Sequence, residues 1–224
     1  MKILWGSVML LIGLLFMPSG SRGEAIIKLP PPVHQGKLSV EEALSLRRTV
    51  RHFANRALDL KQVSQLLWGA DGMSDPRGLR TAPSAGATYP LDLYLVVGER
   101  GVGQLGPGLY HYRPGDHSLE LTSKGDLRAG VARAALHQTW MAEAPVMVVI
   151  TGEYSRCTRR YGERGIMYTH MEAGHVGQNL FLQAEALGLG AGIVGAFVDY
   201  SMSQVLGLPK EHEPLLIMPV GYKH

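Results

Sequence analysis

The sequence predicts an α+β fold built as one domain. Three observations lead to this prediction: some segments have the apolar patterns of strands, others have the capping patterns of helices, and the two kinds follow one another without the regular alternation of a β-α-β architecture. The chain has 224 residues, of which 46% are hydrophobic and 18% are charged. That size and composition are typical of a globular protein with one substantial core.

Two helices are predicted at the start of the folded part. Ser39 and Glu42 have the spacing of a capping box, in which each side chain binds the backbone of the other residue, and an apolar run follows. Asp59 and Gln62 repeat this pattern ahead of apolar residues at helical spacing. The second helix is expected to end within residues 68–72, which contain two glycines.

The middle of the chain predicts strands. Residues 91–97 alternate and are rich in branched and aromatic side chains, which is typical of a strand. Residues 109–112 and 119–121 flank a Pro-Gly-Asp turn and so predict a hairpin. Residues 145–150 are an unbroken apolar run after a proline, as in a strand that is buried on both faces.

The longest predicted helix covers residues 168–187 and ends at Gly188. Gly174 and Gly177 each cost it roughly 1 kcal/mol relative to Ala, which suggests that another backbone, such as that of a second helix, approaches closely there. Shorter predicted elements are a helix over residues 126–136, a helix that closes at residues 205–209 and a final strand at residues 214–221.

The N-terminus has the pattern of a secretory signal peptide. A basic start, an apolar run and a small, polar stretch occupy residues 1–23, with cleavage expected after Gly23 or Ala25. The apolar run is shorter than the ~20 residues of a spanning helix. We therefore expect residues 24–38 to be an extended linker, residues 39–224 to form the domain, and the protein to be exported to the periplasm; a membrane anchor formed by an uncleaved leader is the alternative.

Charge and cysteine content exclude several classes of protein. The net charge is +3 without a long Lys/Arg run, so no nucleic-acid partner is expected. The single cysteine, Cys157, excludes an intrachain disulfide and a multi-thiolate metal site. His170 and His175 are five residues apart and do not share one helix face, so no metal site is expected there either.

Two features suggest binding rather than packing. Residues 47–51 contain three arginines around Thr49, a combination suited to gripping a phosphate, although a solvated basic edge is the simpler alternative. Residues 80–90 and 188–199 are loops of mostly small residues, which let backbone N–H and C=O groups approach a flat or charged ligand. Ser84, in the first of these loops, lacks the GxSxG context of a hydrolase nucleophile.

The chain resembles the FMN-dependent nitroreductase superfamily, and within it the SagB/ThcOx-type branch that includes the azoline dehydrogenases of peptide biosynthesis. Seven motifs in the same order carry the resemblance, which covers nearly everything after residue 36. They are residues 47–51, 66–68, Arg80 with 83–90, 108–110, 161–165, 172–175 with 178–179, and 219–221.

The resemblance implies a mostly antiparallel central sheet flanked by helices, in an intertwined homodimer with one FMN in each of two clefts at the subunit interface. The long helix with Gly174 and Gly177 would be the dimer helix. The FMN phosphate and ribityl chain would be held by Arg47, Arg48, Thr49 and Arg51, with Lys223 as a further base. The flavin ring would lie between Pro83, Ser84, Ala85 and Gly86 on one side and Ile193, Val194, Gly195 and Ala196 on the other. Gln178 is a further candidate for cofactor binding.

The implied activity is hydride or electron transfer through the flavin to or from an unidentified small molecule. The Lys-Tyr pair of the azoline dehydrogenases corresponds to Arg160-Tyr161 here, and because arginine keeps its proton, Tyr161 is the candidate catalytic residue. Two alternatives follow from this replacement and from the leader: a flavin-binding protein without turnover, for carriage or sensing, and an azoline dehydrogenase acting on a modified peptide.

Overall fold

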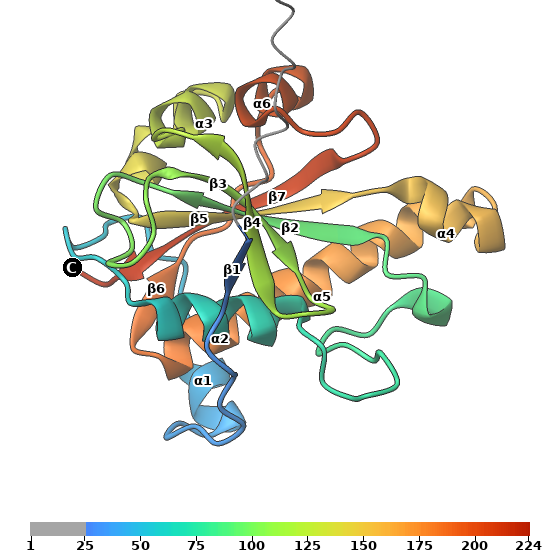
Figure 1. Ribbon diagram of the computed structural model, residues 1–224, viewed down its shortest axis with the longest axis horizontal. Coiled ribbons are helices and arrows are strands. Elements are labelled where there is room, and N and C mark those ends of the chain that lie inside the picture. Colours follow the sequence, from blue (N-terminus) through green and yellow to red (C-terminus); the bar gives the residue numbers. More distant parts are fainter. Residues whose placement is uncertain (1–25) are drawn as a thin grey trace, which may run out of the picture.

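The protein is described from a computed structural model, in which residues 26–224 are the described part, so the predicted signal peptide lies outside the described residues. Within them, seven strands form one antiparallel sheet in the order β1-β4-β3-β2-β5-β7-β6 (Figure 1). The strands are β1 Ile26–Lys28, β2 Leu91–Val97, β3 Gly108–Arg113, β4 Ser118–Lys124, β5 Val146–Gly152, β6 Leu189–Ala191 and β7 Glu213–Tyr222. The predicted α+β class and antiparallel sheet are confirmed.

Helices cover both faces of the sheet. They are α1 Val40–Leu46, α2 Leu60–Asp71, α3 Arg128–Ala134, α4 Tyr154–Tyr161, α5 Arg164–Ala186 and α6 Asp199–Leu206, with short 3₁₀ turns η1 Ala85–Ala87 and η2 Thr139–Glu143. Figure 1 shows α1, α2 and α5 on one side of the sheet and α3 and α6 on the other. The sheet is therefore the middle layer of three.

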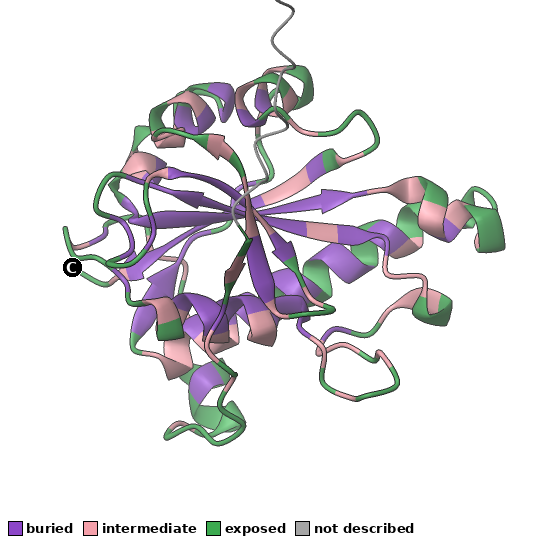
Figure 2. Ribbon diagram, viewed as in Figure 1, coloured by how far each residue is buried: buried purple, intermediate pink, exposed green. Residues whose placement is uncertain are grey.

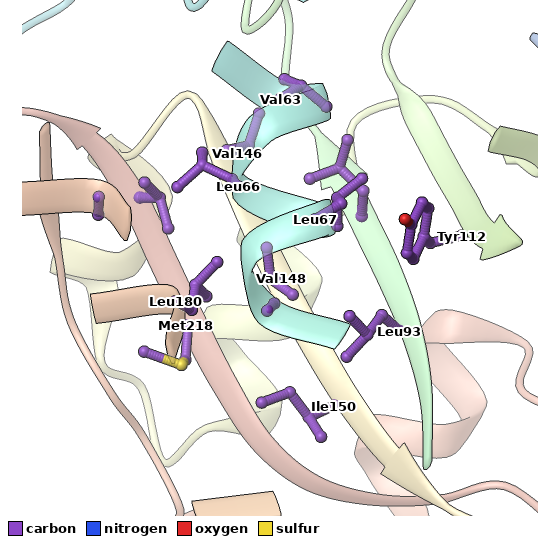
Figure 3. Packing of buried hydrophobic residues seen from close by; sticks show 14 of the residues in the cluster. Val63, Leu66, Leu67, Leu93, Tyr112, Val146, Val148, Ile150, Leu180 and Met218 are labelled. Atoms are coloured by element: carbon purple, nitrogen blue, oxygen red, sulfur yellow. The ribbon is translucent and has the colours of Figure 1, made fainter. Parts of the chain in front are cut away.

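Two hydrophobic clusters fill the spaces between these layers. Val146, Val148 and Ile150 of β5 pack toward α2 and α5 (Figure 3), whereas Met147 and Val149 pack toward α3 and α6. This explains the unbroken apolar run of β5, because alternate side chains enter different clusters and both faces are buried (Figure 2). The sheet is thus a rigid centre on which the surface loops are placed.

Both predicted capping boxes are present. Ser39 Oγ accepts from Glu42 N at 3.1 Å and Asp59 Oδ1 accepts from Gln62 N at 2.7 Å, while each partner side chain returns a hydrogen bond to the cap. The hairpin, the final strand and the short helix before it are also as predicted. Part of the predicted linker adds an edge strand, since β1 pairs with β4.

Four elements differ from the prediction. The long helix begins at Arg164, four residues before the predicted start at 168, and α3 is shorter than predicted. Helix α4 was not predicted, because its only buried residue is Cys157 and no apolar face marks it. Strand β6 lies inside the small-residue loop, where it pairs with the end of β7.

Gly174 and Gly177 of α5 have no second helix against them within residues 26–224. A Cβ at Gly174 would meet nothing within 4 Å, and one at Gly177 would meet side chains only, at 3.6 Å. At these two positions the expected close backbone approach is therefore absent among residues 26–224, and Gly174 is exposed. Over the same residues, no helix is long and apolar enough to span a bilayer.

Candidate functional site

The arginine-containing segment is attached to one edge of the sheet. Thr49 pairs with Ala191 of β6, Val50 N donates to the Ala191 carbonyl at 2.8 Å, and Phe53 pairs with Lys223. The segment borders a cavity of about 660 Å³, lined by Thr49, Val50, Arg51, His52, Lys223 and His224. The structure thus brings the predicted phosphate-binding residues and Lys223, which are distant in the sequence, to one place.

The basic side chains at this edge are not equivalent. Arg47 lies over the ring of Phe181 at 5.0 Å and Arg51 over that of Trp140 at 5.8 Å, and neither forms an ion pair within residues 26–224. Arg48 instead donates to the carbonyls of Ser45 and Arg47 at the end of α1. Lys223 pairs with Glu185 at 2.6 Å. Arg47 and Arg51 are therefore the arginines of this edge whose guanidinium N–H donors are engaged neither by a carboxylate nor by a backbone carbonyl of the described residues.

The second small-residue loop lies between this edge and α5. Val194 points inward and pairs with Ile217, whereas Ile193, Gly195 and Ala196 are exposed. Ile193 and Gly195 border a cavity of about 590 Å³. Other residues that line it are Tyr154, His170, Ala173, Gly174, Phe197 and Leu216. Backbone atoms of this loop are thus accessible next to the exposed glycine face of α5.

The first small-residue loop is fixed against α4. Ser84 Oγ accepts from Tyr89 N at 2.9 Å, and Arg160 donates to the carbonyl of Gly86 at 3.0 Å. Gly86 has φ = 57°, and a Cβ there would overlap the hydroxyl of Tyr161. Glycine adopts this φ without strain, and the contact places the predicted catalytic residue, Tyr161, directly against this loop.

A buried acidic group under this loop was not recognised from the sequence. Glu172 of α5 is 2% exposed, and neither of its carboxylate oxygens makes a hydrogen bond of standard geometry. Burial raises the pKa of Glu172 to about 7, against the opposing effects of the Ser84 hydroxyl and the Arg80 charge. Glu172 belongs to one of the seven motifs that carry the family resemblance, at residues 172–175. That motif does not indicate that its carboxyl group is buried.

The two small-residue loops do not face each other within one chain. The Ser84–Ala85 backbone lies near Glu172, whereas the 193–196 loop lies beside Gly174 and Gly177. Glu172 and Gly174 are two residues apart, which places them about 160° apart around a helix with 3.6 residues per turn. Gln178 is exposed one turn beyond Gly174, on the same face. The predicted site residues therefore form two groups on different sides of α5.

This donor set fits an anionic, flat ligand. Arg47, Arg51 and Thr49 supply hydrogen-bond donors for a phosphate. Two glycine-containing loops expose backbone atoms: the 193–196 loop lies near these donors, and the 83–86 loop lies on the other side of α5. Cys157 is buried. No group of three His, Cys, Asp or Glu side chains in the described part of the chain is arranged to hold a metal ion.

Comparisons with known proteins show which family the chain is similar to. The model of the Nitroreductase family matches residues 44–222. A curated candidate nitroreductase of Methanocaldococcus jannaschii is 44% identical over 187 residues, which cover 84% of this chain and 92% of that protein. The structure of a candidate nitroreductase from Ralstonia eutropha superposes with a TM-score of 0.79 at 30% identity, covering 95% of this chain and 96% of the other.

A more distant match is to a protein that processes microcin B17. The microcin B17-processing protein McbC of Escherichia coli is 25% identical over 169 residues, which are 73% of this chain and 62% of McbC. The chain therefore spans less than two thirds of that relative.

Proposed function

The chain belongs to the nitroreductase family of oxidoreductases, and from this premise we propose that it is an FMN-dependent enzyme that works as a homodimer on a small molecule. Each of two equivalent clefts between the subunits would hold one FMN. When bound, FMN would supply hydride or electron transfer. The protein residues would position the cofactor and the substrate and handle protons.

The observation that carries this proposal is the separation of the two loops by α5. One flat ligand cannot contact the 83–86 loop and the 193–196 loop of the same chain, since they lie on opposite sides of that helix. Two chains packed antiparallel along α5 would bring the first loop of one copy to the second loop of the other. The open space at Gly174 is where such a copy would lie, in place of a partner helix from the same chain.

Each group of residues then has a defined task. Arg47, Arg51 and Thr49 would hold the phosphate, because two guanidinium groups held over aromatic rings are already oriented and remain without a carboxylate. Exposed backbone at 193–196 would contact the ring face. Tyr161, next to Gly86 at the other loop, would exchange a proton with the substrate through its hydroxyl.

The match to McbC favours azoline oxidation as a second candidate. The position that would carry the lysine is Arg160, and its guanidinium donates to Gly86 O and keeps its proton. Proton removal would then rest on Tyr161 alone, so we place this candidate second. As the site of action we propose the periplasm, on the basis of residues 1–23; sequencing the N-terminus of the protein from that compartment tests this.

The phosphate assignment predicts the behaviour of Arg47→Gln/Arg51→Gln. Two lost charge-assisted hydrogen bonds, at 1.5–3 kcal/mol each, should weaken FMN binding by roughly 100-fold or more. Riboflavin, which lacks the phosphate, should bind both proteins equally. The measurement is flavin fluorescence titration of the mature protein, together with its mass in solution.

Arg133→Gln is the matched control, because Arg133 is exposed on α3, on the other side of the sheet. It should leave both affinities unchanged. A protein that binds no flavin, or a double variant that binds FMN normally, would refute the assignment.

A further inference from the structure

We propose that Arg159, Arg160 and Arg164 form a cationic rim that selects substrates carrying a carboxylate or similar oxyanion attached to a flat, conjugated group. This inference rests on the proposed function, since it names the substrate class of the same site. The rim lies at the corner between α4 and α5, where the chain turns at Gly162 with φ = 58° (Figure 1). All three arginines are exposed.

The three guanidinium groups are held in place without being neutralised. Arg160 donates to Gly86 O at 3.0 Å, Arg164 Nε to Tyr168 Oη at 3.4 Å, and Arg159 to Ser155 Oγ at 3.4 Å. None of these acceptors is a carboxylate, and none of the three arginines forms an ion pair within residues 26–224. Each guanidinium has five N–H donors, so most remain available to a ligand.

A fourth arginine of this region, Arg156, differs from these three because carboxylates compensate its charge. Arg156 lies 2.7 Å from Glu153 and 2.8 Å from Asp92, so its charge is fully compensated. Glu163, at the start of α5, is exposed and pairs with none of the rim arginines within 4.0 Å. The rim therefore has an excess of positive charge that this region's own acids do not satisfy, which is the arrangement for bidentate binding of an oxyanion.

Aromatic rings between the arginines indicate the shape of the ligand. Tyr161 and Tyr168 meet edge to face with centroids 5.2 Å apart, and the guanidinium carbons of Arg160 and Arg164 lie 5.5 and 5.6 Å from the centroids of these rings. Flat conjugated groups pack on such surfaces. Because Arg160 also contacts Gly86, the rim adjoins the loop assigned to the flavin, so a substrate held there would lie beside the reacting ring.

The test compares an acid with its neutral isostere. Calorimetry measures the Kd of 4-nitrobenzoate and of 4-nitrobenzamide for the flavin-loaded protein and for Arg160→Gln/Arg164→Gln, with Arg133→Gln as the control. The double variant should weaken 4-nitrobenzoate about tenfold or more and 4-nitrobenzamide less than twofold. Arg160→Lys/Arg164→Lys, which keeps the charge, should retain part of the preference.

Turnover gives a second measurement. With the neutral donor 1-benzyl-1,4-dihydronicotinamide, two electrons and two protons convert the nitro group to nitroso and release water. The double variant should raise KM for 4-nitrobenzoate and leave kcat within twofold. Equal Kd values for acid and amide in the unaltered protein, or equal effects of the variant on both, would overturn the proposal. So would a loss of affinity for NADPH alone, because the rim would then serve the donor's phosphates.

The two experiments distinguish failure of the proposed function from failure of the rim proposal. A protein that binds no FMN refutes the enzyme assignment in the fluorescence titration, whatever the rim does. A protein that binds FMN and turns over, but does not distinguish acid from amide, refutes only the rim.

Discussion

Two clusters of charged side chains differ in how many bases compensate their acidic groups. In the first, Asp71 of α2 and Glu172 of α5 share one cation, Arg80. In the second, Asp92 of β2 lies 2.9 Å from His111 and 2.8 Å from Arg156, with His212 at 3.5 Å. The first cluster has two acids for one base, and the second has three bases around Asp92.

The pKa values follow this difference. Burial raises the pKa of Asp71 to about 7, more than the charge of Arg80 lowers it, and burial likewise raises that of Glu172 to about 7. Burial also acts to raise the pKa of Asp92, but the hydrogen bond from His111 and the charge of Arg156 outweigh it and hold the pKa below its usual value. The number of compensating partners, rather than burial alone, decides the direction.

The clusters also differ in what they support. Glu172 lies under the 83–86 loop that we assign to the flavin. Asp92 fixes Arg156 at the start of α4, and Arg156 also donates to Tyr89 O at 3.3 Å. The well-compensated cluster thus anchors the scaffold, and the poorly compensated one lies where a ligand or a proton would act. Perturbed buried acids are common at such sites.

Removing the shared cation should give the largest effect. Arg80→Met leaves Asp71 buried without its partner, and breaking a buried ion pair from one side costs about 3–5 kcal/mol. The loss should be larger at pH 8 than at pH 6, because Asp71 can avoid it by binding a proton. Urea unfolding at both pH values measures it.

The control for this change is Asp71→Asn/Arg80→Met, which removes both charges and should cost less than Arg80→Met alone. Arg77→Met, at an exposed pair with Asp75, should have no measurable effect. An equal loss for the single and double variants would mean that Arg80 acts through packing, for example with Tyr89, whose ring it covers at 4.5 Å.

A smaller effect is expected at Glu172. Its pKa is higher in the folded protein than in the unfolded chain, so the folded state binds more protons and stability falls as pH rises from about 4.5 to about 7. Glu172→Gln should remove this decline and be more stable than the natural protein at pH 8, by no more than about 3 kcal/mol. Unfolding free energies at pH 5 and pH 8 test this, with exposed Glu211→Gln as the control; parallel pH profiles would contradict it.

Local patterns made most of the fold predictable. Ser39 with Glu42 and Asp59 with Gln62 fixed two helix starts because capping is a contact between residues three apart. The apolar run of β5 correctly predicted a strand that is covered on both faces. Helix α4 was missed because its residues are positioned by Asp92 and Gly86, far away in the sequence, and not by an apolar face of its own.

The candidate site was predictable in composition but not in arrangement. The sequence identified residues 47–51, 83–86 and 193–196 through a family resemblance. The sequence did not reveal that Arg48 caps α1, that Lys223 pairs with Glu185, or that α5 separates the loops. Those facts depend on side-chain contacts between distant segments, for which no local pattern exists.

The smallest effect should come from the well-compensated cluster. His212 accepts from or donates to Tyr94 Oη at 2.8 Å and is one of three bases near Asp92, so His212→Asn should cost about 1 kcal/mol at pH 8. Burial lowers the pKa of His212, so the unfolded chain binds more protons and the natural protein loses stability as pH falls below about 6.5. The variant lacks this loss, and the difference in unfolding free energy between the two proteins should therefore shrink at pH 5.

His137→Asn, at an exposed residue whose φ of 60° asparagine tolerates, is the control. A cost at His212 as large as that of Arg80→Met would show that Asp92 depends on one base, and the contrast between the two clusters would fail.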